Sequence, residues 1–276
     1  MRHWVGICIL VLTILSISFV VAANINVLVP STNVRTLAEI YLKYTYYPWD
    51  KYFTAMSPEA CTSIVWDFRG LDTVFETMVF YLAIIGAIAL ARGIPLKLPR
   101  EVKGELGLSL IVKTVTKIVP VLIIAVAGSI ALHGHLTPGG GFQGGATAAV
   151  APVLILVVFS QFYLLKRGVN KNSMLLLRSI GLTGIGITAF AAVLIGLATG
   201  HYAFVLQNQP KPLAPDVSLP AFVGGQLISG SLWFFNFFEF LAVAAGFTIV
   251  FLLITLPEKL VKTEEKEQVE KEGEEK

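Results

Sequence analysis

The sequence has few charged residues and almost no cysteine. Only 14% of its 276 residues are charged, while 55% are hydrophobic. A soluble domain of this length could not bury so much apolar surface, so the composition excludes an ordinary soluble protein and indicates an integral membrane protein. The two cysteines, Cys8 in an apolar run and Cys61 in a polar connection, argue against a disulfide framework, a thiolate metal site or an iron–sulfur cluster.

Other motifs that carry chemistry are also absent. The densest run of glycines lacks the lysine that follows the glycines of a phosphate-binding loop. His133 and His135 lie close together, but two ligands are too few for a metal site, which needs three or four. We therefore expect no cofactor, no metal ion, no nucleic-acid partner and no catalytic centre in this chain. Whether it belongs to a redox-driven enzyme complex stays open.

Six apolar runs are long enough to cross a bilayer, which takes about 20 residues. They are Trp4–Ala23, Leu71–Ala91, Leu106–Leu132, Phe142–Leu165, Met174–Thr199 and Leu232–Leu256. The sequence thus predicts an all-α integral membrane protein with about six transmembrane helices. The first run also fits a secretory signal peptide, with Ala22 and Ala23 at a cleavage site. Its apolar part exceeds a usual signal core, which favours a retained helix.

Basic segments predict how the chain crosses the membrane. Arg92–Lys103 and Lys166–Lys171 fall on one side of the predicted spans, together with Arg2 and the charged tail 258–276. Positively charged loops stay in the cytoplasm, so we expect both termini to be cytoplasmic in a multi-pass protein of the cell membrane. The connection Asn24–Gly70, the turn Gly134–Gly145 and the loop Pro210–Pro220 then face outside. We interpret the first as a surface loop with a short helix near Leu37–Lys43.

A glycine-rich stretch, Gly134–Gly145, separates the third and fourth apolar runs. Glycine permits close backbone approach and positive φ, and proline ends an incoming helix. The stretch therefore predicts a tight turn between two membrane helices, with His133 and His135 at its mouth. The residues that we expect to build this turn are Gly134, Pro138, Gly139, Gly140, Gly141, Gly144 and Gly145.

Acidic residues within membrane helices indicate functional sites by default. Asp72 and Glu76 are four residues apart and share a helical face at the start of the second run. Asp72 is placed to cap that helix, whereas Glu76 fits either an interfacial acid or a buried proton site. Glu239 lies well inside the sixth run without a basic neighbour on its own helix. Such a lone carboxylate needs a proton or a partner from another helix.

Lysines and small residues complete the pattern of the membrane spans. Lys113 and Lys117 share a face of the third run, and Lys113 can extend toward the basic loop. Lys117 lies deeper, so it is the better candidate for a buried cation with an acidic partner, which we expect on a neighbouring chain rather than at Glu239. Small residues at four-residue spacing in the fifth run, from Gly184 to Gly200, predict a seam for close helix packing.

Two stretches resemble parts of one known family, the multisubunit Mrp-type cation/proton antiporters. The sequence His-Gly-His-Leu-Thr-Pro-Gly-Gly-Gly-Phe-Gln-Gly-Gly at 133–145 is similar to the signature of their MnhB-type component, and the likeness extends over about 106–256. The sequence Ile-Val-Trp-Asp-Phe-Arg-Gly-Leu-Asp-Thr at 64–73, followed by Glu76, resembles the C-terminal membrane segment of the family's large first component, over about 24–93. Related archaeal respiratory complexes have that segment as a separate small protein. One departure is Phe75, where the segment commonly has glycine.

The resemblance implies an organisation and a function. Residues 1–95 would be a two-helix segment like the end of the large component, 96–257 a four-helix MnhB-like domain, and 258–276 a charged tail. The chain would be a membrane component of a sodium/proton antiporter, assembled with other antiporter-type subunits and either free-standing or attached to hydrogenase-like or sulfur-reducing subunits. The alternative is a non-catalytic scaffold. Candidates for the ion and proton path are Asp72, Glu76, Lys117, His133, His135 and Glu239.

Overall fold

The computed structural model describes residues 2–23, 35–91 and 108–255. The basic segment 92–103 and the charged tail, on which part of the predicted orientation rests, lie outside the described residues. The chain forms two compact units, Met1–Ile40 and Tyr41–Lys276. The first contains the helix α1 (Arg2–Ala23), whose side chains from Gly6 to Ala23 are all exposed.

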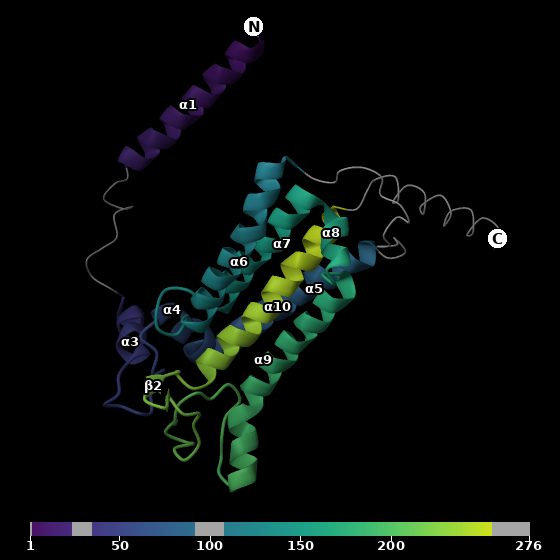
Figure 1. The fold of residues 1–276 in the computed structure, drawn as a ribbon. Coiled ribbons are helices and arrows are strands. Elements are labelled where there is room, and N and C mark those ends of the chain that lie inside the picture. The colour runs from purple at the N-terminus through teal and green to yellow at the C-terminus, as the bar shows by residue number, and fades with distance from the viewer. Residues whose placement is uncertain (1, 24–34, 92–107, 256–276) are drawn as a thin grey trace, which may run out of the picture. The chain divides into compact units, whose positions relative to one another are not determined.

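Six helices among the described residues are long and apolar enough to cross a membrane, as the sequence predicts. Besides α1 they are α5 (Gly70–Leu90), α6 (Leu110–Leu132), α7 (Gly141–Phe159), α9 (Lys171–Thr199) and α10 (Ser231–Ile254). In the second unit α10 is central: it packs against α9 and α7, α7 packs against α6, and α5 makes a smaller contact with α10 (Figure 1). A helix that is apolar on every side suits this position because it has neighbours on several faces.

The fourth apolar run is not one helix, which corrects the predicted span Phe142–Leu165. The helix α7 ends at Phe159, Ser160 has a φ of +88°, and a short helix α8 (Gln161–Lys166) follows. The break turns α8 so that Leu164 packs with Leu156 and Leu252 in one buried cluster. Apolar residues continue on both sides of Ser160, so the hydropathy pattern could not show the break.

The helix α9 begins with a complete cap. Asn170 accepts hydrogen bonds from the backbone N–H groups of Asn172 and Ser173, and Ser173 Oγ accepts one from Asn170 N–H at 3.1 Å. The predicted small seam packs in two ways. A Cβ on Gly184 would collide with the Phe238 ring of α10, whereas one on Gly196 would meet His201 O at 2.6 Å. Only part of the seam therefore contacts another helix.

Several short elements gather at the end of the bundle where α6 ends and α7 and α10 begin (Figure 1). They include α4 (Ala60–Ser63), the π-helix η1 (Ile64–Phe68) and an antiparallel hairpin of β1 (Phe222–Val223) and β2 (Gln226–Leu227). The predicted short helix is present as α3 (Thr36–Thr45). The rest of this connection is not a plain surface loop, because residues 54–57 are all buried.

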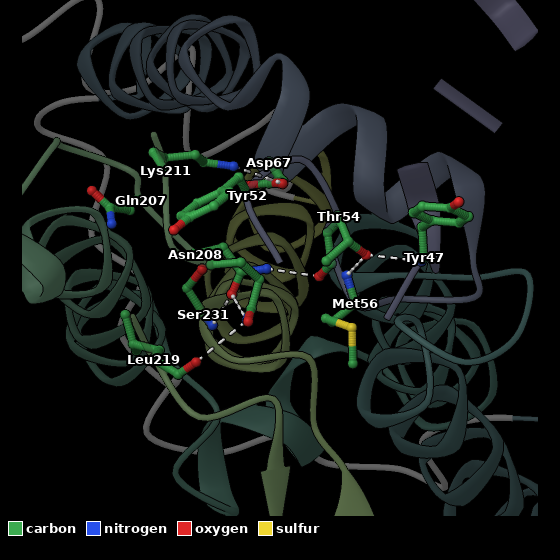
Figure 2. A network of polar contacts seen from close by, with 12 residues as sticks. Tyr47, Tyr52, Thr54, Met56, Asp67, Gln207, Asn208, Lys211, Leu219 and Ser231 are labelled. Atoms are coloured by element: carbon green, nitrogen blue, oxygen red, sulfur yellow. Dashed lines mark hydrogen bonds and ion pairs between the residues drawn. The ribbon is translucent and has the colours of Figure 1, made fainter. Parts of the chain in front are cut away.

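Uncharged polar side chains bind the two long connections together (Figure 2). Asn208 is fully buried; its Nδ2 donates to Ala55 O at 2.9 Å and its Oδ1 accepts from Ser231 N at 3.0 Å. Ser229 Oγ donates to Met56 O at 2.6 Å. These bonds satisfy backbone groups that burial removes from water. The connections therefore form one packed cap over the start of α10, which fixes where that helix begins.

Candidate functional site

Glu239 lies inside the bundle on α10 and is only 7% exposed. Its carboxylate sits against the N-terminus of α7, because a Cβ built on Gly141 would lie 2.6 Å from Glu239 Cβ and 2.7 Å from its Oε2. Any side chain at 141 would occupy the space of the carboxylate. The glycine-rich turn and the deep acid, which the sequence presents as separate features, thus form one site.

Asn236 lies about one turn before Glu239 on α10 and completes this contact. Its Oδ1 accepts a hydrogen bond from the Gly141 N–H at 3.3 Å, so a side chain of α10 satisfies a free donor at the start of α7. Gly141, Gly144 and Gly145 were predicted to belong to the turn, but they lie in the first turns of α7, where they allow close approach of other helices. A Cβ on Gly144 would lie 2.8 Å from Ala127 O of α6, and one on Gly145 would lie 2.9 Å from Phe240 O of α10.

The start of α7 does not offset the cost of burying a carboxylate. A helix N-terminus stabilises a nearby negative charge by about 0.3–1 kcal/mol, and by about 2 kcal/mol in favourable partly buried geometry. Removing a carboxylate from water costs several kcal/mol. The difference must come from water, from a proton, from a bound cation or from a positively charged side chain nearby. Glu239 is therefore placed where its charge state depends on what else occupies the site.

Glu76 faces the same space from α5. A cavity of about 190 Å³ is lined by both acids, by the amide side chains of Gln143 and Asn236, and by Cys61 near the cap. Glu76 is itself exposed and also lines an open groove on the outer face of α5. The cavity thus joins a buried acid on α10 to an acid that reaches the surface of the chain.

A second, smaller cavity of about 60 Å³ is also lined by Glu76 and Glu239. Arg178 of α9 lines it from the other side and is 2% exposed. Its Nη2 donates to Phe80 O at 3.3 Å, and its guanidinium carbon lies 5.1 Å from the centroid of the Tyr81 ring. Arg178 was not among the predicted site residues. Its position as an arginine within the fifth apolar run was the signal that could have found it.

The residues around the cavities suit a hard cation or a proton. Carboxylate and amide oxygens are the ligands that such cations prefer, and carboxylates also exchange protons. No group of three or more His, Cys, Asp and Glu side chains that could hold a metal ion occurs among the described residues.

The other predicted site residues lie elsewhere. Asp72 is exposed and forms an ion pair with Arg69, so it does not cap α5 as expected, although it lies in the first turn. His133 is exposed, with Nδ1 3.0 Å from Ser129 O. His135 is buried, with Nε2 2.9 Å from Leu227 O, and burial lowers the pKa of its imidazole. The two histidines have different partners, and neither lines the two cavities.

Lys117 lies on the exposed face of α6 and away from both cavities. Within the described part of the chain no acid forms an ion pair with it. Lys113, one turn earlier, is half-buried. The two deep charges, Lys117 and Glu239, therefore face different surroundings.

A buried acid in the cap was not among the predicted site residues. The Asp67 side chain in η1 is 1% exposed, and Lys211 Nζ lies 3.6 Å from its Oδ2 (Figure 2). Burial raises the pKa of Asp67 to about 6, and the nearby lysine opposes this rise. The adjoining Trp66 stacks on Phe235 of α10 with ring centroids 4.3 Å apart. The π-helix thus anchors the start of α5 to the cap and to α10.

These features define a multi-pass membrane protein that carries acidic residues in cavities within its helix bundle. A family model described as "Domain related to MnhB subunit of Na+/H+ antiporter" matches residues 111–249, about half of the chain. The chain belongs to this family. A relative in Methanocaldococcus jannaschii, described as an uncharacterized protein, is 26% identical, with 76% of this chain and 83% of the relative covered.

Two solved structures share the fold. One is the membrane-bound sulfane sulfur reductase (MBS), an archaeal respiratory membrane complex, with a TM-score of 0.65, 24% identity, and 92% of this chain and 100% of that chain covered. The other is the Mrp complex from Dietzia sp. DQ12-45-1b, with a TM-score of 0.59, 17% identity, and 90% of this chain but 26% of that chain covered. The matched chains come from membrane complexes, and the likeness concerns the fold.

Proposed function

We propose that this protein is a membrane component of a multisubunit sodium/proton antiporter and contributes Glu76 and Glu239 to the path of sodium ions and protons. The observation that carries the proposal is that these acids, from α5 and α10, line the same two cavities inside the bundle. Family membership supports the assignment to an antiporter. In a shared cavity a cation and a proton bind to the same carboxylates. Binding of one then weakens binding of the other, and this competition allows the two to be exchanged.

The chain combines two functional segments in this proposal. Residues 1–95 act as the segment like the end of the large antiporter component, 96–257 as the MnhB-like domain, and 258–276 as a tail. The fold match to the Mrp complex supports this, because 90% of the present chain corresponds to 26% of one longer chain, well beyond the family match at 111–249. The acids also come from both segments, so joining them keeps the two sides of the cavity together.

Its partners are other antiporter-type membrane subunits in the cytoplasmic membrane. The fold likeness to the sulfane sulfur reductase also fits a module attached to hydrogenase-like or sulfur-reducing subunits. The basic segments 92–103 and 166–171 support cytoplasmic termini, with the cap on the outer side. The cavity that Cys61 lines would then be reached from outside, next to the cap.

Charge-neutral variants of the acids test this function. Glu239→Gln and Glu76→Gln, each in the assembled complex in membrane vesicles, should abolish most sodium-dependent proton movement. Asp72→Asn is the matched control, because Asp72 precedes Glu76 by one turn but forms an exposed ion pair with Arg69. It should retain exchange. Undiminished exchange in both glutamine variants would refute the proposal.

A scaffold is the second candidate, and the outer faces of α5 and α6 favour it. Among apolar side chains such as Val79 and Ile118, these faces expose the charged residues Glu76 and Lys117. A charge is costly against lipid, so these faces suit contact with other subunits. Recovery of the complex separates the two functions. If Glu239→Gln leaves the subunits associated but stops exchange, the acid acts in transport. If the subunits fall apart, the scaffold role explains the loss.

A further inference from the structure

We infer that Arg178 is a counter-charge for Glu76 and Glu239. Its positive charge stabilises the two ionised acids when no sodium ion is bound, and it competes with sodium for their negative charge. This inference rests on the proposed function and deepens it. It assigns a role to a residue that lies outside the two short signatures at 64–73 and 133–145. It also specifies the net charge that a bound ion or proton must neutralise.

Close packing of two helices fixes the position of Arg178. A Cβ on Gly181 would lie 2.6 Å from Phe238 O and 2.7 Å from Ala242 N, so α9 and α10 are in backbone contact there. Arg178 lies about one turn from Gly181 toward the start of α9, and Glu239 lies between the contacted residues of α10. The guanidinium is therefore held near the acid by the backbones of both helices rather than by a flexible loop.

Arg178 has donors that the described residues leave without partners. Its Nη2 donates to Phe80 O, but Nε and Nη1 are buried and make no hydrogen bond to any described residue. A buried guanidinium needs partners for its donors. The charged groups that line its cavity are Glu76 and Glu239, which are not within ion-pair distance of it. A cavity of about 60 Å³ has room for water between them.

The charges around the two cavities determine what the site can hold. Glu76, Glu239 and Arg178 are the charged residues that line them, so two ionised acids and one arginine leave a single net negative charge. One sodium ion or one proton neutralises it. The guanidinium lies over the aromatic rings of Phe80 and Tyr81, and these contacts hold it in place when the exchanged ion leaves.

Removing the arginine charge should therefore strengthen cation binding. Arg178→Gln leaves the acids without their counter-charge, so the sodium concentration for half-maximal exchange at alkaline pH should fall about three- to tenfold. The pH at which protons begin to inhibit exchange should rise, because protons gain the same advantage. Arg178→Lys keeps the charge and is the matched control. It should leave both values close to those of the unchanged protein.

The outcomes separate this inference from the proposed function. If Glu239→Gln stops exchange while Arg178→Gln leaves the sodium dependence and the pH profile unchanged, only the counter-charge is refuted. If Arg178→Gln prevents assembly, the double variant Arg178→Gln with Glu239→Gln should restore it, because both charges of the pair are then removed. Failure to restore assembly would mean that Arg178 acts only through packing, and would overturn the inference.

Discussion

The two deep charges of this protein, Glu239 on α10 and Lys117 on α6, have opposite environments. Glu239 is 7% exposed, lines two cavities and contacts the start of α7. Lys117 lies on the exposed outer face of α6. In sequence each is a charged residue deep within an apolar run. The difference shows that a charge within an apolar run can be buried inside the bundle or exposed on its outer face, and that only packing distinguishes the two.

The contact between Gly141 and Glu239 gives the largest expected effect. Gly141→Ala places a Cβ within 2.7 Å of the carboxylate and closer still to Asn236 O, so α7 and α10 must separate. We expect loss of most assembled complex and of exchange. Gly128→Ala on α6 is the matched control, since its Cβ would meet nothing within 4 Å. The measurement is the yield of intact complex. Equal, normal yields from both variants would contradict the close contact.

Lys117→Met tests the role of the exposed charge on the outer face of α6. Because Lys117 has no acidic partner among the described residues, its removal should leave the thermal stability of the isolated chain nearly unchanged. It should weaken association with neighbouring subunits and lower exchange, and the double variant with Glu239→Gln should be worse than either single change. Lys113→Met is the control. Recovery of exchange in the double variant would instead show a direct pair between Lys117 and Glu239.

A variant of Asp67 tests whether the buried acid in the cap makes stability depend on pH. Its pKa of about 6 lies above the ordinary value of 3.8, so the folded state favours the protonated form. The contribution of Asp67 to stability is therefore fully present below about pH 4 and is lost as the pH rises through about 6, a change of roughly 3 kcal/mol. Asp67→Asn should remove this slope. Thermal unfolding in detergent as a function of pH measures it, and an unchanged slope would exclude Asp67 as the cause.

Cysteine labelling tests the orientation in the membrane, and we expect it to have the smallest effect on stability and exchange, because the substituted positions are exposed. In a variant without Cys8 and Cys61, Thr137→Cys should react with an impermeant reagent from outside, and Asn172→Cys should not. Both positions are exposed, whereas Gly140 in the same turn is buried and a poor choice. The reverse labelling pattern would place the cap in the cytoplasm and invert the proposed orientation.

Hydropathy was sufficient to predict the six helices that are long and apolar enough to cross a membrane, because length and apolar composition are read directly from the sequence. It could not predict the break at Ser160 or the packed cap, since these depend on φ at one residue and on hydrogen bonds such as that from Asn208 to Ala55. Glu76 and Glu239 were candidates from sequence, but their common cavity required the tertiary structure. Arg178 was missed because the small residues dominate the pattern of its helix.

The groove beside Glu76 on the outer face of α5 bears on how such a complex is built. A protein that enters the bilayer alone presents this acid to lipid, where a charged side chain costs about 2.5–3.5 kcal/mol on insertion scales. A neighbouring chain that covers the groove removes that cost. The acid that we propose for transport would thus make the solitary protein less favourable in the membrane than the assembled one. Assembly of the complex would then have a preferred order, in which a neighbouring subunit covers this face of α5 before the ion path is completed.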